Sequence, residues 1–359
     1  MSHLKIFQEA LASLSLDGAL ISSEAGQRYL SDFPFSDGYL LITPEDAYLL
    51  TDSRYVEAAK EKAMGFEILL PEKRMTATLA ELISEHKIDR LALEEDAVSY
   101  SDYHTFSEKL TPAKLCTGAS KILSELRAVK TPKEIGRIAK AQEITDRAFS
   151  HILNFIASNL ATATEQDVAL ELEFFMRKQG SEGVAFDTIA VSGPASSRPH
   201  GVPTNVKFRR GFLTMDFGAR VDGYCSDMTR TVVIGKADEE LKKIYHTVLA
   251  AQENALEHIQ AGMLCRDADE LARSVIRSAG YGDAFGHSLG HGVGLVVHEV
   301  PSLSPKAKED SVLKIGNVVT VEPGIYLEGK CGCRIEDMVV ITEDGILNFT
   351  KSSKELIEL

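Results

Sequence analysis

The chain has 359 residues, more than one hydrophobic core usually supports, so we expect two domains. With 44% hydrophobic and 26% charged residues it has the composition of a globular protein, and its net charge of −14 at pH 7 disfavours binding to nucleic acids. No stretch approaches the roughly 18 consecutive apolar residues of a membrane-spanning helix, and the N-terminal segment lacks the apolar core of a signal peptide. We therefore expect a cytoplasmic protein without membrane association.

The first third of the chain alternates strand and helix patterns. Residues 1–21 predict an amphipathic helix that leads into a strand, and short apolar runs such as DGALISS and IDRLALEED predict strands. Helical periodicity is found in DSRYVEAAKEKA and TATLAELISEHK. Alternation of this kind is typical of an α/β domain, in which a small sheet is flanked by helices.

A helix start signal follows the first third. Thr131 can cap a helix whose first residue is Pro132, and Glu134 stands at the third helical position, where it would complete a capping box. We expect this helix to extend to about Asn159. The domain boundary is predicted near residue 122, which gives domains 1–122 and 123–359.

The second domain repeats one order of elements. Two helices and then several strands are predicted for residues 131–235, and the same order is predicted for residues 237–342. The predicted strands include YCSDMTRTVVIG, GVGLVVHE, NVVTVEPGIYL and CRIEDMVVIT. The halves share no obvious sequence identity, so the repeat is an inference about structure alone. It predicts a pseudo-symmetric sheet layered by helices, with a cleft between the halves.

Two aspartates lie on either side of a strong turn signal in the first half. Asp222-Gly223 separates apolar runs and predicts a two-residue hairpin turn. Counting outward from this turn places Asp216 opposite Thr229, and it places Asp216 and Asp227 on one face as diagonal neighbours, about 7–8 Å apart. A single aspartate in a strand is usually solvated, but two like charges on an apolar face require a compensating cation.

Two glutamates occupy similar places in the second half. Glu322 ends the apolar run VVTVE, and Glu336 precedes the apolar run MVVIT. Together with an imidazole from the histidine-rich segment 285–301, the four carboxylates suit a pair of divalent ions such as Mn²⁺, Co²⁺, Fe²⁺ or Zn²⁺. Such a pair, about 3.5–4 Å apart, would activate a water molecule near neutral pH, so the residues alone favour a metal-assisted hydrolase.

The cysteines indicate free thiols rather than a metal site. There are five, an odd and sparse set that fits free thiols in a reducing compartment. Cys331 and Cys333 form a lone Cys-x-Cys pair, which we interpret as two small residues on one strand face.

Three histidines fall within the segment FGHSLGHGVGLVVHEVP, residues 285–301. His287 and His291 are four residues apart, but the glycines around them argue against a helix and predict a turn into a strand. The helical zinc motif His-Glu-x-x-His is absent from the sequence. A lone histidine in an apolar stretch is more often a core residue, whereas His287, His291 and His298 together favour a site. His200 adds a fourth in a Pro/Gly-rich loop, where catalytic groups often lie.

These segments resemble a known family. TMDFGARVDGYCSDMTRT, FGHSLGHGVGLVVHEVP, VTVEPGIYL and CRIEDMVVIT are similar to the pita-bread metallopeptidases, and most of all to their Xaa-Pro aminopeptidase and Xaa-Pro dipeptidase (prolidase) branch. The first 120 residues resemble the creatinase/prolidase N-terminal domain through RYLSDFPFSDGYLLIT and LLTDSRYVEAA. The resemblance implies an α/β creatinase-like N-terminal domain followed by an α+β pita-bread catalytic domain with a pseudo-two-fold repeat.

The resemblance also implies a set of site residues. It implies two divalent metal ions, most readily Mn, with Co, Zn and Fe as alternatives. The five residues that it assigns as ligands are Asp216, Asp227, His291, Glu322 and Glu336. Glu322 would also accept a proton from the attacking water and pass it to the leaving amine.

Further residues are implied to contact the substrate. His298 and His200 would hydrogen-bond the scissile carbonyl and the tetrahedral intermediate, and His287 would line the pocket for the proline ring. Tyr326 and Arg334 match positions near the site, although Arg334 could instead orient Glu336 or Asp227.

The resemblance predicts a cytoplasmic Xaa-Pro aminopeptidase that acts on proline-containing peptides and forms a homodimer. A prolidase restricted to dipeptides is the alternative. A methionine aminopeptidase is disfavoured by the large N-terminal domain, and creatinase is disfavoured because the five ligand residues are present. An alternative of another class is a metal-free pita-bread module that only binds a partner.

Overall fold

The computed structural model describes residues 2–359 and divides the chain into two compact units, Met1–Arg127 and Ala128–Leu359. The predicted boundary near residue 122 lies inside helix α6 (Ala119–Ala128). Within residues 2–359, no helix combines the length and apolar character that crossing a bilayer requires.

The first unit is built on one mixed six-stranded sheet with the order β4-β3-β2-β1-β5-β6. Its strands are β1 (Gly18–Ile21), β2 (Tyr39–Ile42), β3 (Ala47–Leu50), β4 (Glu67–Leu69), β5 (Arg90–Leu93) and β6 (Lys114–Cys116). Its other helices are α1 (His3–Ser13), α2 (Glu24–Ser31), α3 (Val56–Lys62), α4 (Met75–Glu85) and α5 (Tyr100–Lys109). Apolar residues of the central strands are buried against these helices, so the predicted α/β architecture is confirmed.

The second unit contains the repeat that the sequence predicts. Its helices are α7 (Pro132–Asn159), α8 (Glu165–Lys178), α9 (Glu239–His258) and α10 (Cys265–Ser278), with the short 3-10 helices η1 (Gly193–Ser197) and η2 (Gly282–Ala284). The first half has the strands β7 (Ile189–Ser192), β8 (Gly211–Phe217), β9 (Arg220–Val221), β10 (Tyr224–Cys225) and β11 (Met228–Ile234). The second half has the strands β12 (Gly290–Gly292), β13 (Glu299–Leu303), β14 (Val318–Val321), β15 (Gly324–Leu327), β16 (Cys331–Arg334), β17 (Asp337–Thr342) and β18 (Gly345–Asn348).

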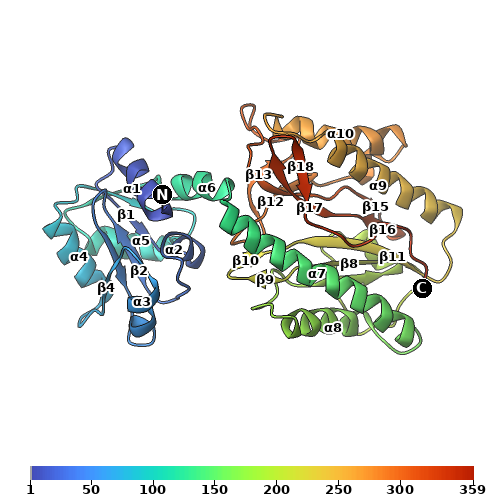
Figure 1. Ribbon diagram of the computed structural model, residues 1–359, viewed down its shortest axis with the longest axis horizontal. Coiled ribbons are helices and arrows are strands. Elements are labelled where there is room, and N and C mark those ends of the chain that lie inside the picture. Colours follow the sequence, from blue (N-terminus) through green and yellow to red (C-terminus); the bar gives the residue numbers. More distant parts are fainter. Residues whose placement is uncertain (1) are drawn as a thin grey trace. The chain divides into compact units, whose positions relative to one another are not determined.

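Each half packs a pair of helices on its own strands. Helices α7 and α8 bury apolar side chains with β7, β8 and β11, whereas α9 and α10 form a second core with the strands of the second half. Figure 1 shows α9 and α10 side by side and α7 and α8 side by side, with strands between the two pairs. The α+β architecture with a repeated order of helices and strands, predicted from the sequence, is therefore confirmed.

Two local predictions hold residue by residue. Thr131 caps α7 and forms the capping box with Glu134, and the helix ends at Asn159. In the hairpin, Tyr224 pairs with Val221 and Thr229 pairs with Asp216, as the turn at Asp222-Gly223 predicts. Both turn residues adopt positive φ, 47° and 80°, which such a turn requires.

Three predicted strands are interrupted at a carboxylate residue. YCSDMTRTVVIG forms β10 and β11, with a break at Ser226-Asp227. NVVTVEPGIYL splits at Glu322-Pro323 and CRIEDMVVIT splits at Ile335-Glu336. At each break the chain passes from one sheet to another, so the three carboxylates stand at sheet junctions rather than within a strand.

The prediction of a strand through GVGLVVHE is wrong for residues 293–298. Only Gly292 belongs to β12, and β13 begins at Glu299. The intervening turn is closed by a hydrogen bond from Gly294 N to Val296 O (3.1 Å) and by one from Val296 N to the Glu299 carboxylate (3.1 Å). This side-chain contact holds the turn, and the apolar pattern of the segment does not reveal it.

Candidate active site

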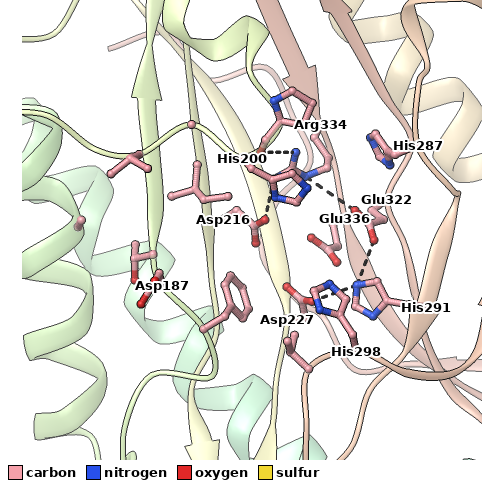
Figure 2. Close-up of a pocket in the computed structure, with 18 of the residues that line it drawn as sticks. Asp187, His200, Asp216, Asp227, His287, His291, His298, Glu322, Arg334 and Glu336 are labelled. Atoms are coloured by element: carbon pink, nitrogen blue, oxygen red, sulfur yellow. Dashed lines mark hydrogen bonds and ion pairs between the residues drawn. The ribbon is translucent and has the colours of Figure 1, made fainter. Parts of the chain in front are cut away.

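A cavity of about 910 Å³ lies in the second unit and is lined by residues from both of its halves. Nine of the ten side chains singled out in the sequence line it: His200, Asp216, Asp227, His287, His291, His298, Glu322, Arg334 and Glu336. Figure 2 shows their side chains gathered around one space, with the aspartates on one side of it and His291 on the other. The tenth, Tyr326, is not among the residues that line the cavity, but its hydroxyl contacts two of them, Arg334 and His287.

The first half contributes Asp216 from β8 and Asp227 from the break before β11. On β11, Thr229 pairs with Asp216, is fully buried and donates a hydrogen bond to Glu336 Oε2 (2.7 Å). Thr229 also accepts a hydrogen bond from Arg334 Nε (2.9 Å), so it links a glutamate to an arginine. The sequence places Thr229 opposite Asp216 but gives no sign of this linking position.

The second half contributes His291 on β12. Its Nε2 lies 3.3 Å from Glu322 Oε1 and 3.6 Å from Asp227 Oδ2. The other ring nitrogen, Nδ1, lies 3.1 Å from the carbonyl oxygen of Gly292, so a proton on Nδ1 leaves Nε2 available as a ligand. A Cβ atom on Gly290 would lie 2.0 Å from the carbonyl oxygen of Thr320, so this close strand approach requires glycine.

Three of these side chains are close enough to bind one ion. The ligand atoms of Asp227, His291 and Glu336 lie within 4.8 Å of one another. In addition, Asp216 Oδ1 and Glu336 Oε1 are buried and have no hydrogen-bond partner among residues 2–359. Unpaired buried carboxylate oxygens beside an imidazole are the donor set that divalent transition metals prefer, so the residues present fit a metal centre.

The electrostatics of the site lead to the same conclusion. Burial raises the pKa of Asp227 well above its usual value, and the negative charges of Glu336 and Asp216 raise it further. Burial, followed by the charge of Glu322, likewise raises the pKa of Glu336. These carboxylates compete for protons because the described residues supply too little positive charge. A bound cation would remove that competition.

Glu322 and His291 behave as a pair. Burial acts to raise the pKa of Glu322, but the hydrogen bond and the charge of His291 outweigh it and lower this pKa to about 2. Burial acts to lower the pKa of His291, but the hydrogen bond and the charge of Glu322, together with smaller contributions from Gly292 and Asp216, make the net shift upward. Thr320 Oγ1 also donates to Glu322 Oε1 (3.1 Å), which fixes the carboxylate beside the ring.

Arg334 is the buried cation of the cavity, with 3% of its surface exposed. It donates to Asp216 Oδ2 (2.6 Å) and to the Tyr326 hydroxyl (2.7 Å), and its Nε lies 3.9 Å from Glu322 Oε2. Among the described residues it forms no ion pair with Glu336 or Asp227, the partners that the sequence left open. The Tyr326 hydroxyl lies 3.1 Å from His287 Nε2, so Arg334, Tyr326 and His287 form one chain of contacts.

The remaining histidines face the same space. The rings of His298 and His291 meet edge to face with centroids 4.3 Å apart. Burial lowers the pKa of both His298 and His287, which favours neutral rings near pH 7 that can each donate one N–H. His200 reaches the cavity from the loop between β7 and β8.

Comparison with known proteins identifies the family. Residues 136–343, more than half of the chain, match metallopeptidase family M24, and residues 3–129 match the creatinase/prolidase N-terminal domain. The chain belongs to metallopeptidase family M24. It is therefore a hydrolase, and the predicted family is confirmed.

Several M24 relatives match nearly the whole chain. A solved Xaa-Pro dipeptidase from Bacillus anthracis is 42% identical, has a TM-score of 0.95 and covers 99% of both chains. An X-Pro aminopeptidase structure from Thermotoga maritima MSB8 is 40% identical, has a TM-score of 0.89 and covers 98% of this chain and 99% of its own. An Xaa-Pro dipeptidase from Pyrococcus furiosus is 37% identical over 96% of each chain. These relatives divide between the two activities that the sequence left open.

Within this M24 fold, two polar residues near the cavity carry no sequence signal of a site. Asp187 lines the cavity on the side opposite His287 (Figure 2). Glu165, the first residue of α8, is 1% exposed and lies beneath the His200 loop. Both occur in ordinary sequence contexts, and only the folded arrangement reveals their positions.

Proposed function

We propose that this M24 peptidase is an Xaa-Pro aminopeptidase, which removes the first residue of a peptide whose second residue is proline. The observation that carries the proposal is the meeting of Asp227, His291 and Glu336 in a cavity that also holds unpaired carboxylate oxygens. The names of the B. anthracis and T. maritima relatives support the Xaa-Pro preference.

The residues proposed to hold two divalent ions are Asp216, Asp227, His291, Glu322 and Glu336. Ions bound there would polarise the substrate carbonyl and lower the pKa of a water molecule. Four carboxylate charges match two divalent cations, and Arg334 orients one of these carboxylates through its contact with Asp216. Manganese is the proposed metal, with cobalt, zinc and iron as the alternatives.

Glu322 is proposed as the proton carrier of the reaction. The pKa of Glu322 is lowered to about 2 in the metal-free site, and bound cations would likewise favour the ionised carboxylate, which is the state that can accept a proton from the attacking water. The carboxylic acid so formed then donates this proton to the nitrogen of the leaving proline. Thr320 Oγ1 donates to Glu322 and holds it in place for both transfers.

His298 and His200 are proposed to donate hydrogen bonds to the scissile carbonyl as negative charge develops on its oxygen. His287 would lie against the proline ring. His287 Nε2 contacts the Tyr326 hydroxyl, and Arg334 donates to the same hydroxyl, so the His287 side chain is rigidly supported where it would contact the proline. Such support keeps the substrate aligned with the attacking water.

The size of the cavity favours an aminopeptidase over a dipeptidase. At about 910 Å³ it lies near the upper end of the roughly 300–1,000 Å³ typical of small-molecule sites, which leaves room for residues beyond proline. The prolidase alternative requires that this room be closed by another part of the protein. Homodimer formation and a cytoplasmic location stay predictions from the sequence.

A direct assay separates the candidates. We expect the purified protein, stripped of metal and reloaded in turn with Mn²⁺, Co²⁺, Zn²⁺ and Fe²⁺, to cleave both Ala-Pro and Ala-Pro-Ala and to leave Ala-Ala-Ala intact. Cleavage of Ala-Pro alone would make it a prolidase. A protein that binds no metal and cleaves none of the three peptides under any of these ions would support the metal-free binding module instead.

A further inference from the structure

His200 lies on a loop with open space on both sides. The loop joins β7, which ends at Ser192, to β8, which begins at Gly211. Its residues Gly201 and Val202 line the active-site cavity and also a second cavity of about 500 Å³. Val202 is exposed, so side-chain packing supports it weakly, and hydrogen bonds hold this part of the loop: Arg334 Nη1 donates to the carbonyl oxygen of Pro199 (3.3 Å), and further contacts hold the two ends of the loop.

One buried carboxylate joins those two ends. Glu165 Oε1 accepts hydrogen bonds from the backbone N (2.7 Å) and hydroxyl (2.8 Å) of Ser192, where the loop begins. Glu165 Oε2 accepts from the hydroxyl (2.9 Å) and backbone N (3.3 Å) of Thr204, after His200. Four donors thus satisfy both oxygens, and this offsets the cost of burying the charge.

The backbone at the start of α8 strengthens the same junction. The first N–H groups of a helix have no partner within the helix, and here Glu165 N donates to Val206 O (3.1 Å) and Gln166 N donates to Thr204 O (3.2 Å). Arg209 N donates to the Ser192 hydroxyl (3.1 Å). The returning arm of the loop is therefore held by both Glu165 and Ser192.

We infer that Glu165 is a positioning residue for His200: it closes the loop so that the His200 ring points into the active-site cavity. This inference rests on the proposed role of His200 as a donor to the scissile carbonyl. Glu165 does not line the active-site cavity, so it acts through the loop rather than on the substrate. A shift of His200 by about 1 Å would be expected to slow the reaction by up to about 100-fold.

The test is a double-mutant cycle on the metal-loaded, full-length protein. Glu165→Gln places an amide group against hydrogen-bond donors of Ser192 or Thr204. We expect kcat for Ala-Pro-Ala to fall about 10- to 100-fold with little change in KM and with unchanged metal content. In a His200→Ala background the same substitution should cost less than about twofold, because the residue that it positions is gone.

Asp167→Asn is the matched control. Asp167 lies in the same first turn of α8 and completes the capping box with Thr164, but it is exposed, and the hydrogen bonds that its carboxylate accepts come from Thr164 rather than from Ser192 or Thr204. We expect its kcat to stay within about twofold of the parent. An equal loss of kcat in Asp167→Asn and Glu165→Gln would overturn the inference, because it would reflect damage to the helix end alone. An equal cost of Glu165→Gln with and without His200 would overturn it as well.

Two measurements separate this inference from the proposed function. Parent-like activity of His200→Ala would contradict the role of His200, whatever Glu165 does. Amide hydrogen exchange of residues 198–206 reports the anchor directly, and unchanged protection in Glu165→Gln would contradict the anchor, whatever the activity. If Glu165→Gln does not fold, Thr204→Val removes one Glu165 contact, and the same cycle with His200→Ala is expected to show the same non-additivity at a smaller size.

Discussion

Glu336 and Asp337 are neighbours in the chain, and each is 1% exposed, but their surroundings differ. Asp337 accepts from Arg230 Nη2 (2.8 Å) and Lys354 Nζ (3.1 Å), and these cations lower its pKa although burial acts to raise it. Glu336 has one oxygen held by Thr229 and one without a partner among the described residues, and its pKa is raised. Burial is equal in the two cases, so the supply of cations makes the difference. Asp337 is neutralised by the chain itself, whereas Glu336 is left for a cation from outside.

The two surroundings share Arg230, which is fully buried. Besides binding Asp337, it donates to the carbonyl oxygens of Glu336 (2.5 Å) and Thr229 (3.0 Å). Its remaining donors reach Ser352 and Ser353 in the C-terminal segment. The buried pair of Arg230 and Asp337 (the completed pair) thus also fixes the backbone of Glu336. Glu336 belongs to the proposed metal ligands Asp227, His291 and Glu336 (the incomplete cluster), so the completed pair supports the metal site.

The largest effect is expected from breaking the completed pair. Arg230→Met leaves Asp337 with Lys354 and the neutral amide of Asn348, and it removes donors from four backbone carbonyls. We expect the free energy of unfolding of the second unit to fall by about 3–5 kcal/mol, the usual cost of removing one partner of a buried pair. Lys242→Met, which breaks an exposed pair with Glu239, is the control and should cost less than about 1 kcal/mol. Denaturant unfolding measures the loss of stability in both variants. Similar losses would argue against the difference drawn between the buried pair and an exposed one.

The incomplete cluster predicts a loss of function rather than of fold. Asp227→Asn removes one carboxylate from the three-residue group, so we expect at least one metal site to stay empty. Activity on Ala-Pro-Ala should fall by more than about 100-fold, because even partners outside a ligand set are worth about 10–100-fold. Metal content per chain and initial rates measure both effects. Full metal loading at the parent rate would refute the assignment of Asp227 as a ligand.

The sequence predicts best what local contacts determine. The bounds of α7 follow from Thr131, Pro132 and Glu134, which interact within one turn. The hairpin register follows from Asp222-Gly223, because the turn alone sets which residues pair. The ligand set itself came from resemblance to a family, since charge and alternation alone left the solvated alternative open.

The sequence does not predict what distant segments determine. The strand breaks at Glu322 and Glu336 are held by backbone hydrogen bonds from Glu322 N to Leu289 O (2.8 Å) and from Glu336 N to Thr229 O (3.1 Å). Both acceptors lie far away in the sequence, and the apolar runs on either side predict unbroken strands. Glu165 was missed for the same reason, because its partners are Ser192 and Thr204.

A third prediction compares the two neighbours directly in metal-free protein. Glu336→Gln removes a charge that the chain does not balance, so we expect the free energy of unfolding to rise, on the order of 1 kcal/mol. Asp337→Asn removes a charge that Arg230 and Lys354 do balance, and the free energy of unfolding should fall. Thermal unfolding in the presence of a chelator measures both. A loss of stability in both variants would mean that Glu336 is satisfied without an added ion.

The smallest effect is expected in the pH dependence of metal-free stability, where the two groups have opposite signs. The raised pKa values of Asp227 and Glu336 mean that the folded state takes up protons before the unfolded state does, so their contribution to stability rises as the pH falls from neutral towards 4.5. The lowered pKa of Asp337 means that its contribution is complete above 3.8 and is lost as the pH falls below that value.

With a chelator present, the melting temperature should therefore rise as the pH is lowered from about 7 to about 5, before acid unfolding begins. Added Mn²⁺ should shift the maximum to higher pH, because the ion and the protons compete for the same oxygens. The double variant Asp227→Asn/Glu336→Gln should lose both the rise and the Mn²⁺ effect, because it lacks the oxygens that bind them. If the metal-free parent lost stability steadily over that range, these carboxylates would have to be balanced within the chain, and the contrast between Glu336 and Asp337 would disappear.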